Sequence, residues 1–438
     1  MSNTTGPGPV PPEGACDSPP EGAHLASARP DGPRLARAAL TRLVEPGDDL
    51  AVGTVAALGP ERALAVLTGA DRLQPAEQDL LADTLGSAPA IARRWHAGLA
   101  RWAPRAAQLH PERDLVSLHR LGGGLLIPED EAWPTGLDDL GPAAPLGLWF
   151  RGTGALPTTA RALAVVGSRE ATAYGRTVTA AVAEAAVHAG VCVVSGGAYG
   201  IDGAAHRAAL RAGAQTGTSP VPTVAVLAGG LDRLYPAGHE ELLREVMAHG
   251  LLVSEMPPGA SPTRHRFLHR NRVIAALCGA VVVVEARWRS GAQNTAGHAL
   301  GLGRELGVVP GPITSASSAG CHRLLQETPA RLLTDPAQAL ALLPAPAQGS
   351  DRAAGTATSA PAPEPAAEET DSRARAVDGL SMEELLVHEA LPLRQATTVD
   401  RLTVSAGLAP PSVLAALTRL QRRGLAERID DRWRRARA

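Results

Sequence analysis

Two consecutive stretches, LAVVGSREATAYG at residues 163–175 and VCVVSGGAYGIDGAAHRAAL at residues 191–210, decide the fold of this chain. Each begins with a short apolar run rich in valine, passes through a glycine-containing turn and continues as a helix-like pattern. Strands that are apolar on both faces and separated by helix-length segments are typical of a parallel sheet covered on both sides. The two stretches therefore predict repeated strand–helix units.

The same pattern continues through residues 161–310. The further strand-like runs are TVAVLAGG (223–230), LLVSE (251–255), AVVVVEA (280–286) and LGVVPG (306–311). Strands of this kind that alternate with helices predict an α/β domain with a doubly wound, mostly parallel Rossmann-like sheet. We expect this domain to occupy residues 114–343, with short strands and turns in its first part.

The regions that flank this domain differ in composition. Residues 1–33 and the linker 344–376 are rich in Pro, Ala, Gly or acidic residues and are expected to be disordered. Residues 34–113 predict a helical N-terminal domain; its GPERA turn fits a SAM-like or helix-hairpin-helix DNA module, and a plain helical packing domain is the alternative. Residues 377–438 predict a winged helix-turn-helix domain whose hairpin turns at residues 430–431.

Composition limits the classes of function. The chain has 438 residues, of which 45% are hydrophobic and 20% charged, so two or three folded domains are expected. The net charge of −2 supplies no global attraction to nucleic acid or to an anionic membrane. Any binding of nucleic acid must therefore come from a local basic surface. All 42 basic residues are arginine, because the sequence contains no lysine.

Cysteine usage and hydropathy indicate where the protein works. The four cysteines are widely spaced and form no CxxC pair, which argues against a zinc site or a disulfide framework and fits a reducing compartment. No apolar run approaches the roughly 20 residues of a membrane-spanning helix, and the polar N-terminus lacks a signal-peptide pattern. We expect a cytoplasmic protein without a membrane partner.

Glycine-containing turns follow several of the predicted strands. In an open parallel sheet, ligands bind at the carboxyl ends of the strands, where loops and helix N-termini converge. Glycine allows a phosphate to approach the backbone, and helix N-termini offer free N–H groups. A single such turn is equally well explained by tight chain reversal, but several turns at one edge predict an anion-binding cradle. The candidate contacts in these turns are Gly167, Ser168, Arg169, Ser195 and Gly196.

The segment RHRFLHRNR at residues 264–272 is the densest basic stretch of the α/β domain. Cations that neutralise phosphates, beside an aromatic ring that stacks on a base, are what binding of a single nucleic-acid strand requires. The alternative is a solvated charged face that leads into an apolar helix. The segment holds one of only two phenylalanines in the chain, which favours the binding site. Its candidate contacts are Arg264, Arg266, Phe267, Arg270, Asn271 and Arg272.

Enzymatic motifs are incomplete. There is no GxxxxGK[ST] loop, and the first turn is not GxGxxG. His206 lies one helical turn after Asp202, but a capping carboxylate and a packed histidine explain this pair better than acid–base catalysis. No spacing of His, Cys and carboxylates fits a metal site. We therefore predict no catalytic residue, no metal and no cofactor.

Six stretches in order resemble the motifs of the DNA processing A (DprA/Smf) family. They are VVGSREATAYG, VVSGGAYGIDGAAHRAAL, TVAVLAGGLDRLYPAGHEELL, GLLVSEMPPGASPTRHRFLHRNRVIAAL, VVVVEARWRSGAQNTAGHAL and VVPGPITSASSAGCHRLL. The resemblance covers about 115–335, and residues 378–438 are similar to the family's common C-terminal extension. It implies a protein that binds single-stranded DNA, forms a homodimer through the Rossmann-like domain and delivers the strand to RecA in natural transformation, without catalysis or metal.

The resemblance also implies which residues contact DNA. Family contacts fall on Ser168 and Arg169 in the first turn and on the FxxRNR motif that starts at Phe267, with Arg264 just before it. Two positions depart from the family pattern, since Tyr199 and Gly297 stand where the family has arginine. We therefore expect fewer cations at this site than in relatives.

Two other functions are alternatives. A nucleotide phosphoribohydrolase of the lysine-decarboxylase-like (LOG) type shares the architecture but needs a PGGxGTxxE loop, whereas the PGP at residues 310–312 continues as ITSAS. A transcription regulator would act through the winged helix, because residues 419–438 carry eight arginines against three acidic residues. Winged helices bind either duplex DNA or protein, and the sequence leaves both open.

Overall fold

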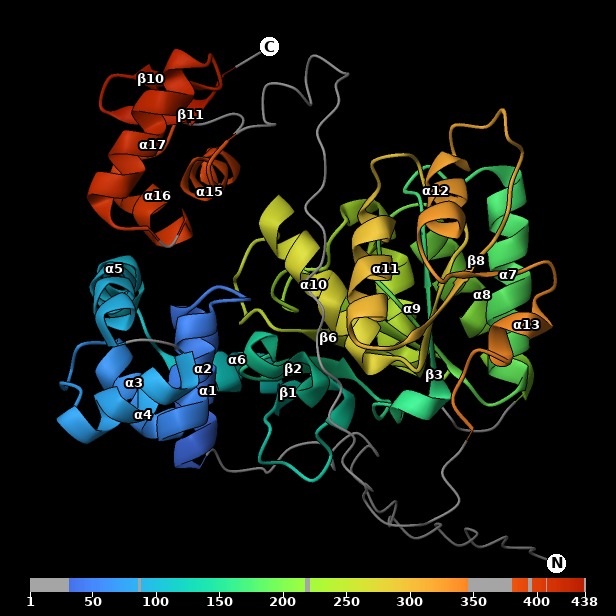
Figure 1. Ribbon diagram of the computed structural model, residues 1–438, viewed down its shortest axis with the longest axis horizontal. Helices are drawn as coiled ribbons and strands as arrows, with labels where there is room; N and C mark the ends of the chain where they lie inside the picture. The colour runs from blue at the N-terminus through green and yellow to red at the C-terminus, as the bar shows by residue number, and fades with distance from the viewer. Residues whose placement is uncertain are drawn as a thin grey trace, which may run out of the picture.

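The structure, a computed structural model, describes residues 31–85, 88–216, 221–345, 380–392, 396–406 and 408–436 (Figure 1). Nearly all of the tail and of the linker that we expected to be disordered lies outside these residues. Within the described part of the chain, no helix is both long enough and apolar enough to cross a membrane.

Nine strands of the described chain form one sheet. Across the sheet they lie in the order β1 (Gly123–Leu126), β2 (Leu148–Gly152), β6 (Leu251–Ser254), β5 (Thr223–Leu227), β4 (Cys192–Ser195), β3 (Ala162–Val166), β7 (Ala280–Val283), β8 (Glu305–Val308) and β9 (Arg331–Leu332). The strands from β6 to β9 are parallel to one another, while β1 and β2 add an antiparallel edge next to β6.

The predicted α/β sheet is confirmed, and each of the six predicted strand runs overlaps one of its strands. The chain first builds outward on one side from β3 to β6 and then crosses to the other side of β3, where β7 to β9 follow. The loops after β3 and β7 therefore leave in opposite directions. In a doubly wound sheet such a topological switch point opens a crevice at the carboxyl ends of the strands.

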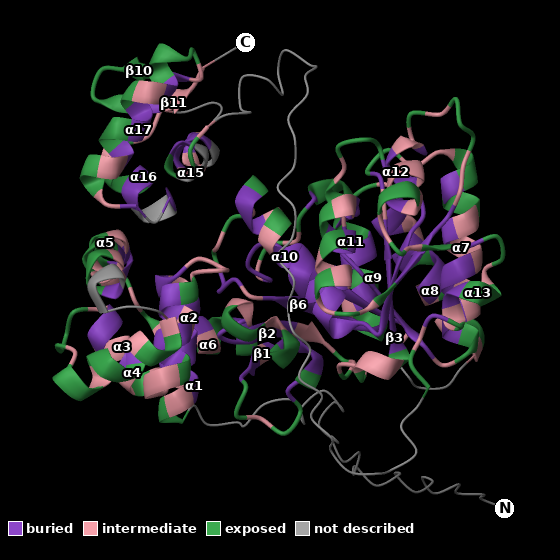
Figure 2. Cartoon of the chain, in the orientation of Figure 1, coloured by how far each residue is buried: buried purple, intermediate pink, exposed green. Residues whose placement is uncertain are grey.

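Helices cover both faces of the sheet. On one face, α7 (Ala173–His188), α8 (Ile201–Thr216) and α9 (Glu240–His249) bury alanine, valine and leucine side chains against the strands. On the other face lie α10 (Arg264–Leu277), α11 (Gly291–Gly301) and α12 (Ala319–Glu327). The short α13 (Ala337–Leu340) returns to the first face. Buried residues are concentrated along the sheet and the inner sides of these helices (Figure 2).

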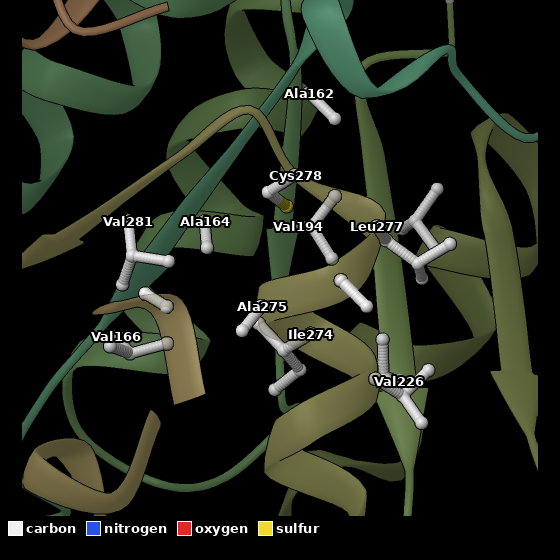
Figure 3. Close-up of a cluster of buried hydrophobic side chains, with 14 of the residues drawn as sticks. Ala162, Ala164, Val166, Val194, Val226, Ile274, Ala275, Leu277, Cys278 and Val281 are labelled. Carbon is white, nitrogen blue, oxygen red and sulfur yellow. The ribbon is translucent and has the colours of Figure 1, made fainter. Parts of the chain in front are cut away.

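The C-terminal half of α10 is the apolar anchor of this helix. Ile274, Ala275 and Leu277 are buried, and Figure 3 shows them in one cluster with the strand residues Val194 and Val226. Burial of large aliphatic side chains at this density stabilises the helix position by about 1.5–3 kcal/mol per residue. The arginine-rich N-terminal half of the same helix is thereby held at the edge of the sheet.

The N-terminal part of the chain is helical, as predicted. Its helices are α1 (Gly32–Leu43), α2 (Asp49–Leu58), α3 (Pro60–Leu67), α4 (Pro75–Leu85), α5 (Ala88–Ala106) and α6 (Pro111–His119). They surround a core that includes Leu40 and Trp102, while Ala38 and Leu118 pack with the lead-in strands β1 and β2. Helix α1 is thus shared between the helical part and the sheet. Short 3₁₀ helices complete this part of the fold: η2 (Thr135–Ala143), η3 (Thr159–Arg161) and η4 (Ala237–His239).

The C-terminal residues form a separate small core around Leu402, Leu417 and Trp433. Its elements are α15 (Met382–Ala390), α16 (Val399–Ala406), α17 (Pro410–Arg422), β10 (Ala426–Ile429) and β11 (Arg432–Arg435). The two strands form an antiparallel hairpin that turns at Asp430, whose φ is 52°. Three helices and a hairpin are present in the expected order, and the winged-helix assignment stays a prediction.

Candidate nucleic-acid interface

A cleft of about 630 Å³ opens at the switch point between β3 and β7. One wall is the turn after β3, from Gly167 to Glu170, and the facing wall is the loop after β7, which contributes Arg287 and Arg289. The N-terminal half of α10 forms a third wall. Residues more than a hundred positions apart in sequence thus line one cavity.

The turn after β3 is held in place by the backbone around it. The N–H of Ser168 donates to the carbonyl of Glu285 at 2.7 Å, and the carbonyl of Ser168 accepts from Ile201 at 3.1 Å. Gly200 packs on this turn with φ of 77°, and a Cβ there would lie 2.2 Å from the oxygen of Ser168. Only glycine fits this position. The turn is therefore a rigid support for the exposed side chain of Arg169.

Two helix N-termini open into the cleft. Thr263 caps α10 by accepting from the N–H of Arg266 at 3.2 Å, and Ser290 caps α11 by accepting from Ala292 at 3.3 Å. Both capping residues line the cavity. Helix N-termini carry partial positive charge and free N–H groups, which favour phosphate and other anions.

An aromatic and cationic row runs along the cleft. The rings of Tyr235 and Phe267 have centroids 5.9 Å apart, and the guanidinium of Arg169 lies 5.1 Å from the centroid of Phe267. Tyr235 is 52% exposed. An arginine held over an aromatic face is a cation–π pair, and its charge remains available to an anion at the edge of the ring. The row can contact bases and phosphates together.

The floor of the cleft holds two buried charged groups, Arg270 and Asp202. Arg270 donates to the carbonyls of Gly196, at 2.7 Å, and of Val226. Burial lowers the pKa of Arg270 to about 10, although the negative charge of Asp202 opposes this shift. Burial likewise raises the pKa of Asp202 against the influence of Arg270. Arg270 remains a cation at neutral pH and faces the cleft from below.

The charge of the lining is positive. Five arginines line the cavity, against the two carboxylates Glu170 and Asp202. Glu170 forms an ion pair with Arg287 in which both side chains are more than half exposed. Exposed ion pairs of this kind contribute little free energy, so a phosphate can replace the carboxylate at small cost. The arginines are Arg169, Arg264, Arg270, Arg287 and Arg289.

Most of the predicted contacts come together in this cleft. The residues that line it are Gly167, Ser168, Arg169, Arg264, Phe267, Arg270 and Asn271. Asn271 also donates to the side-chain oxygen of Asn294 at 3.1 Å and to the carbonyl of Gly291 at 3.3 Å, which ties α10 to α11. Their role in binding DNA stays a prediction.

Four predicted contacts do not line the cleft. Ser195 is fully buried and donates to the carbonyl of Val165 at 2.7 Å, so it joins β4 to β3. Gly196 lies under the floor, where a Cβ would be 2.5 Å from a nitrogen of Arg270 and 2.6 Å from a carboxylate oxygen of Asp202. Arg272 is 3% exposed and pairs with Glu255 at 2.6 Å. The fourth is Arg266.

Arg266 is directed away from the cleft, into the helical N-terminal part. Its guanidinium donates to Glu45 at 2.9 and 2.7 Å and to the carbonyl of Ser261 at 2.7 Å. Glu45 also pairs with Arg105. Burial disfavours the charged form of Glu45, but the positive charges of Arg266 and Arg105 hold the pKa of its carboxyl well below the usual range. This buried cluster fixes the start of α10.

The two positions that depart from the family pattern differ in environment. Tyr199 is 47% exposed, its ring packs edge-on against His239, and its hydroxyl accepts from the N–H of Gly238 at 3.2 Å. It does not line the cleft. A Cβ at Gly297 would meet no atom within 4 Å, so a longer side chain has room there.

The pair Asp202 and His206 is not arranged for acid–base catalysis. Asp202 faces the cleft, whereas the buried His206 makes a 2.7 Å hydrogen bond to the hydroxyl of Thr223. That hydroxyl donates to the carbonyl of Val193, so the Nδ1 of His206 carries the proton and donates to Thr223. Burial lowers the pKa of His206 to about 3. Among the described residues, no group of three or more His, Cys, Asp or Glu side chains is placed to hold a metal ion.

Sequence reasoning missed Tyr235 and Arg287 as candidate contacts. Tyr235 lies in the loop that follows β5, and Arg287 lies in the loop that follows β7. Both therefore satisfy the rule that selected the turn after β3, namely a position beyond the carboxyl end of a parallel strand. An aromatic residue in such a loop, in a chain with only 3% aromatics, was the available signal.

Known proteins were compared with the whole chain. The family model of DNA recombination-mediator protein A matches residues 124–344. A putative DNA processing protein DprA from Mycobacterium tuberculosis is 46% identical over 354 residues, which are 78% of this chain and 83% of that protein. The chain belongs to the DNA recombination-mediator protein A family.

Two further relatives agree with this assignment. The DNA processing protein DprA of Streptococcus pneumoniae is 38% identical over 212 residues, or 48% of this chain and 71% of that protein. The solved structure of DprA from Streptococcus pneumoniae is similar to this fold with a TM-score of 0.52 and 26% identity, over 72% of this chain and 99% of that one. The resemblance in the sequence motifs is thereby confirmed, and the protein is a DNA-processing recombination mediator by family.

Proposed function

We propose that this chain binds single-stranded DNA in the cleft between β3 and β7 and acts as a recombination mediator without catalysing a reaction. The observation that carries this proposal is the row of Tyr235, Phe267 and Arg169 at the mouth of an arginine-lined cavity. Bases stack on aromatic rings in a sequence-tolerant way, and arginines neutralise the phosphates between them.

The shape of the site favours a single strand over a duplex. Phe267 is partly buried between Tyr235 and Arg169, so a base must be unstacked from its neighbours to reach the ring. In a duplex the bases are paired inside the helix and present only their edges in the grooves. The proposed ligand is therefore a strand whose bases are free to turn toward the protein.

The test is the affinity for a fluorescent oligonucleotide of mixed sequence, measured by anisotropy over a range of salt concentrations. Arg169→Ala and Phe267→Ala are each expected to weaken binding by about 1–3 kcal/mol. Arg169→Ala should also reduce the salt dependence by about one released counterion, whereas Phe267→Ala should leave it unchanged. The matched control is Arg211→Ala, an exposed arginine on α8 outside the cleft. Wild-type affinity in both cleft variants would refute the site.

The mediator function includes a recipient for the strand, and we propose RecA in that role. Its support is the description of the family as a recombination mediator, which implies transfer of DNA to a recombinase. Loading of RecA on single strands, measured with and without this chain, tests it. A chain that binds DNA but leaves the rate of RecA loading unchanged would restrict the function to DNA binding.

A homodimer through the Rossmann-like domain is part of the proposal. Both residues of β9 are exposed at the edge of the sheet, and Leu332 is 52% exposed. An exposed strand edge with an apolar residue is a common association surface. Light scattering at several concentrations gives the oligomeric state.

No cofactor, metal or catalytic residue is included in the proposal. The buried, hydrogen-bonded state of His206 and the burial of Asp202, which accepts from the N–H of Ala198 at 3.4 Å, support a structural role for both. The proposal places the protein in the cytoplasm, supported by the three described cysteines, which are buried free thiols.

A further inference from the structure

The loop after β7 presents a second aromatic residue beyond the cleft. Trp288 is 57% exposed, and it lies between Arg287 and Arg289, both of which line the cavity. An exposed indole offers a flat face on which a base can stack and beside which a cation can bind.

This exposure is imposed by a rigid loop. The side chain of Gln293 donates to the carbonyls of Arg287, at 2.8 Å, and of Trp288, at 2.6 Å. On the side of α12, the N–H of Gly320 donates to the carbonyl of Ala286 at 2.8 Å. A Cβ on Gly320 would lie 2.4 Å from the carbonyl oxygen of Arg287, so α12 packs closely against the loop. The loop is thus anchored to α11 and α12, and the indole is held in solvent.

A cation accompanies this indole, as one accompanies Phe267. The guanidinium of Arg323, on α12, lies 5.1 Å from the centroid of the Trp288 ring. Arg323 also pairs with Glu327 at 2.7 Å, in an ion pair that is exposed and therefore weak. An aromatic face beside an arginine is the same combination that the cleft offers to a base and its phosphate.

Tyr235 and Phe267 form one aromatic binding station, in the cleft, and Trp288 forms a second one beyond it. Both stations lie along one edge of the sheet. Tyr235 follows β5, Arg169 follows β3, Arg287 and Trp288 follow β7, and Arg323 lies on the helix after β8. From β5 to β8 the sheet advances by four strand spacings, or about 19 Å at roughly 4.8 Å per strand. At about 3.4 Å per stacked nucleotide, a strand of roughly six nucleotides spans this distance.

We propose that Trp288 and Arg323 form a second binding station for the same DNA strand after it leaves the cleft past Arg287 and Arg289. This inference rests on the proposed function. The ligand is single-stranded DNA of any sequence, since both stations bind through stacking and phosphate charge. Its length is the new element: a short strand occupies only the cleft, whereas a longer one reaches Trp288 as well.

The experiment uses the full chain and two oligothymidylates, one of about four nucleotides and one of about twelve, each competing against a labelled long strand. Trp288→Ala is expected to weaken binding of the long strand by about five- to tenfold, the low end for loss of one stacked base. It should leave binding of the short strand unchanged, which also verifies that the variant is folded. Trp288→Phe should restore most of the affinity for the long strand.

Arg323→Gln should reduce the salt dependence of long-strand binding only, by about 0.7 in the logarithmic slope. Arg211→Gln, which removes an equally peripheral arginine in a surface ion pair, is the matched control and should change neither strand. If Trp288→Ala binds both strands like the wild type, the second station does not exist. If neither strand binds the wild-type chain, the proposed function itself has failed.

Discussion

Individual arginines of the RHRFLHRNR segment have opposite roles although they are close neighbours in sequence. Arg264 and Arg270 line the cleft together with Phe267, whereas Arg266 and Arg272 are directed to the carboxylates Glu45 and Glu255. Helical geometry explains this division, because residues three, four and seven apart share one face of an α-helix. Positions 264, 267, 268, 270, 271 and 274 face the cavity, and 265, 266, 269 and 272 face the other way.

This division was predictable in principle from the sequence. Once the segment is taken as the start of a helix, the spacing alone separates Arg264 from Arg266. The sequence does not contain the reason why the second face is buried, because Glu45 lies more than two hundred residues away. The local pattern shows which residues share one face of the helix. Which residues pack against that face depends on contacts between distant segments of the chain.

At the same scale, His206 makes the stability of the domain depend on pH. Its native pKa of about 3 lies below the usual value near 6.5, so below pH 6.5 the unfolded chain binds a proton that the native chain does not. The contribution of His206 to the free energy of unfolding is therefore fully present at neutral pH, and it decreases as the pH drops from 6.5 toward 3. Between pH 7 and pH 5 the expected loss is about 2 kcal/mol.

Urea unfolding of the wild type and of His206→Leu at these two pH values measures this effect. The leucine has a similar volume and leaves the Thr223 hydroxyl its bond to Val193. The variant is expected to lose about 2 kcal/mol less than the wild type on acidification. An equal loss in both proteins would show that His206 is protonated in the native state at pH 5.

At the scale of elements, α10 connects three parts of the molecule. Its C-terminal half is packed on the sheet (Figure 3), one side of its N-terminal half lines the cleft, and the opposite side is paired with the helical N-terminal part. The helical N-terminal part also holds the loop before α10 in place, since Arg42 of α1 donates to the carbonyl of Pro258 at 2.7 Å. The helical N-terminal part therefore positions the DNA-facing side of α10.

Glu45→Gln tests this coupling. The substitution keeps the size of the side chain but removes the buried negative charge that faces Arg266 and Arg105, which strongly destabilises the contact. We expect the start of α10 to shift and single-strand affinity to fall by about 0.5–2 kcal/mol. The salt dependence should stay unchanged, because Arg266 is not among the phosphate contacts.

Asp130→Asn is the matched control for this variant. It removes the partner of Arg34, a similarly buried ion pair of α1 that contacts the lead-in strands and not α10. A loss of stability without a loss of affinity is expected there. If Glu45→Gln binds DNA like Asp130→Asn, the N-terminal helices have no influence on the site.

At the scale of the whole molecule, the order of strands explains what local patterns left undetermined. Each of the six strand runs was recognisable from its β-branched, apolar residues. The pairing of β2 with β6, and the position of β7 next to β3, depend on contacts between distant segments. The switch point, and with it the exact place of the cleft, therefore followed only from the structure. The charge of the whole chain, −2, gave no sign of a basic cleft.

The C-terminal region provides a prediction at this scale. Its last strand, β11, is rich in arginine, and Arg428 and Arg432 are exposed on the hairpin. A chain that ends at about residue 345 is expected to retain single-strand affinity, because the cleft residues all precede that point. Its affinity for duplex DNA, measured in the same assay, should fall if the hairpin contacts duplex. An unchanged duplex affinity would favour a protein partner for this region.

The switch point has a mechanical consequence as well. The walls of the cleft belong to two halves of the sheet, β3 to β6 and β7 to β9, which are joined in the middle by the pairing of β3 with β7. A strand bound between Arg169 and Arg287 bridges these halves and resists their separation. Bound DNA then stabilises the folded domain by mass action. The protein therefore becomes more resistant to unfolding and to proteolysis while DNA is bound.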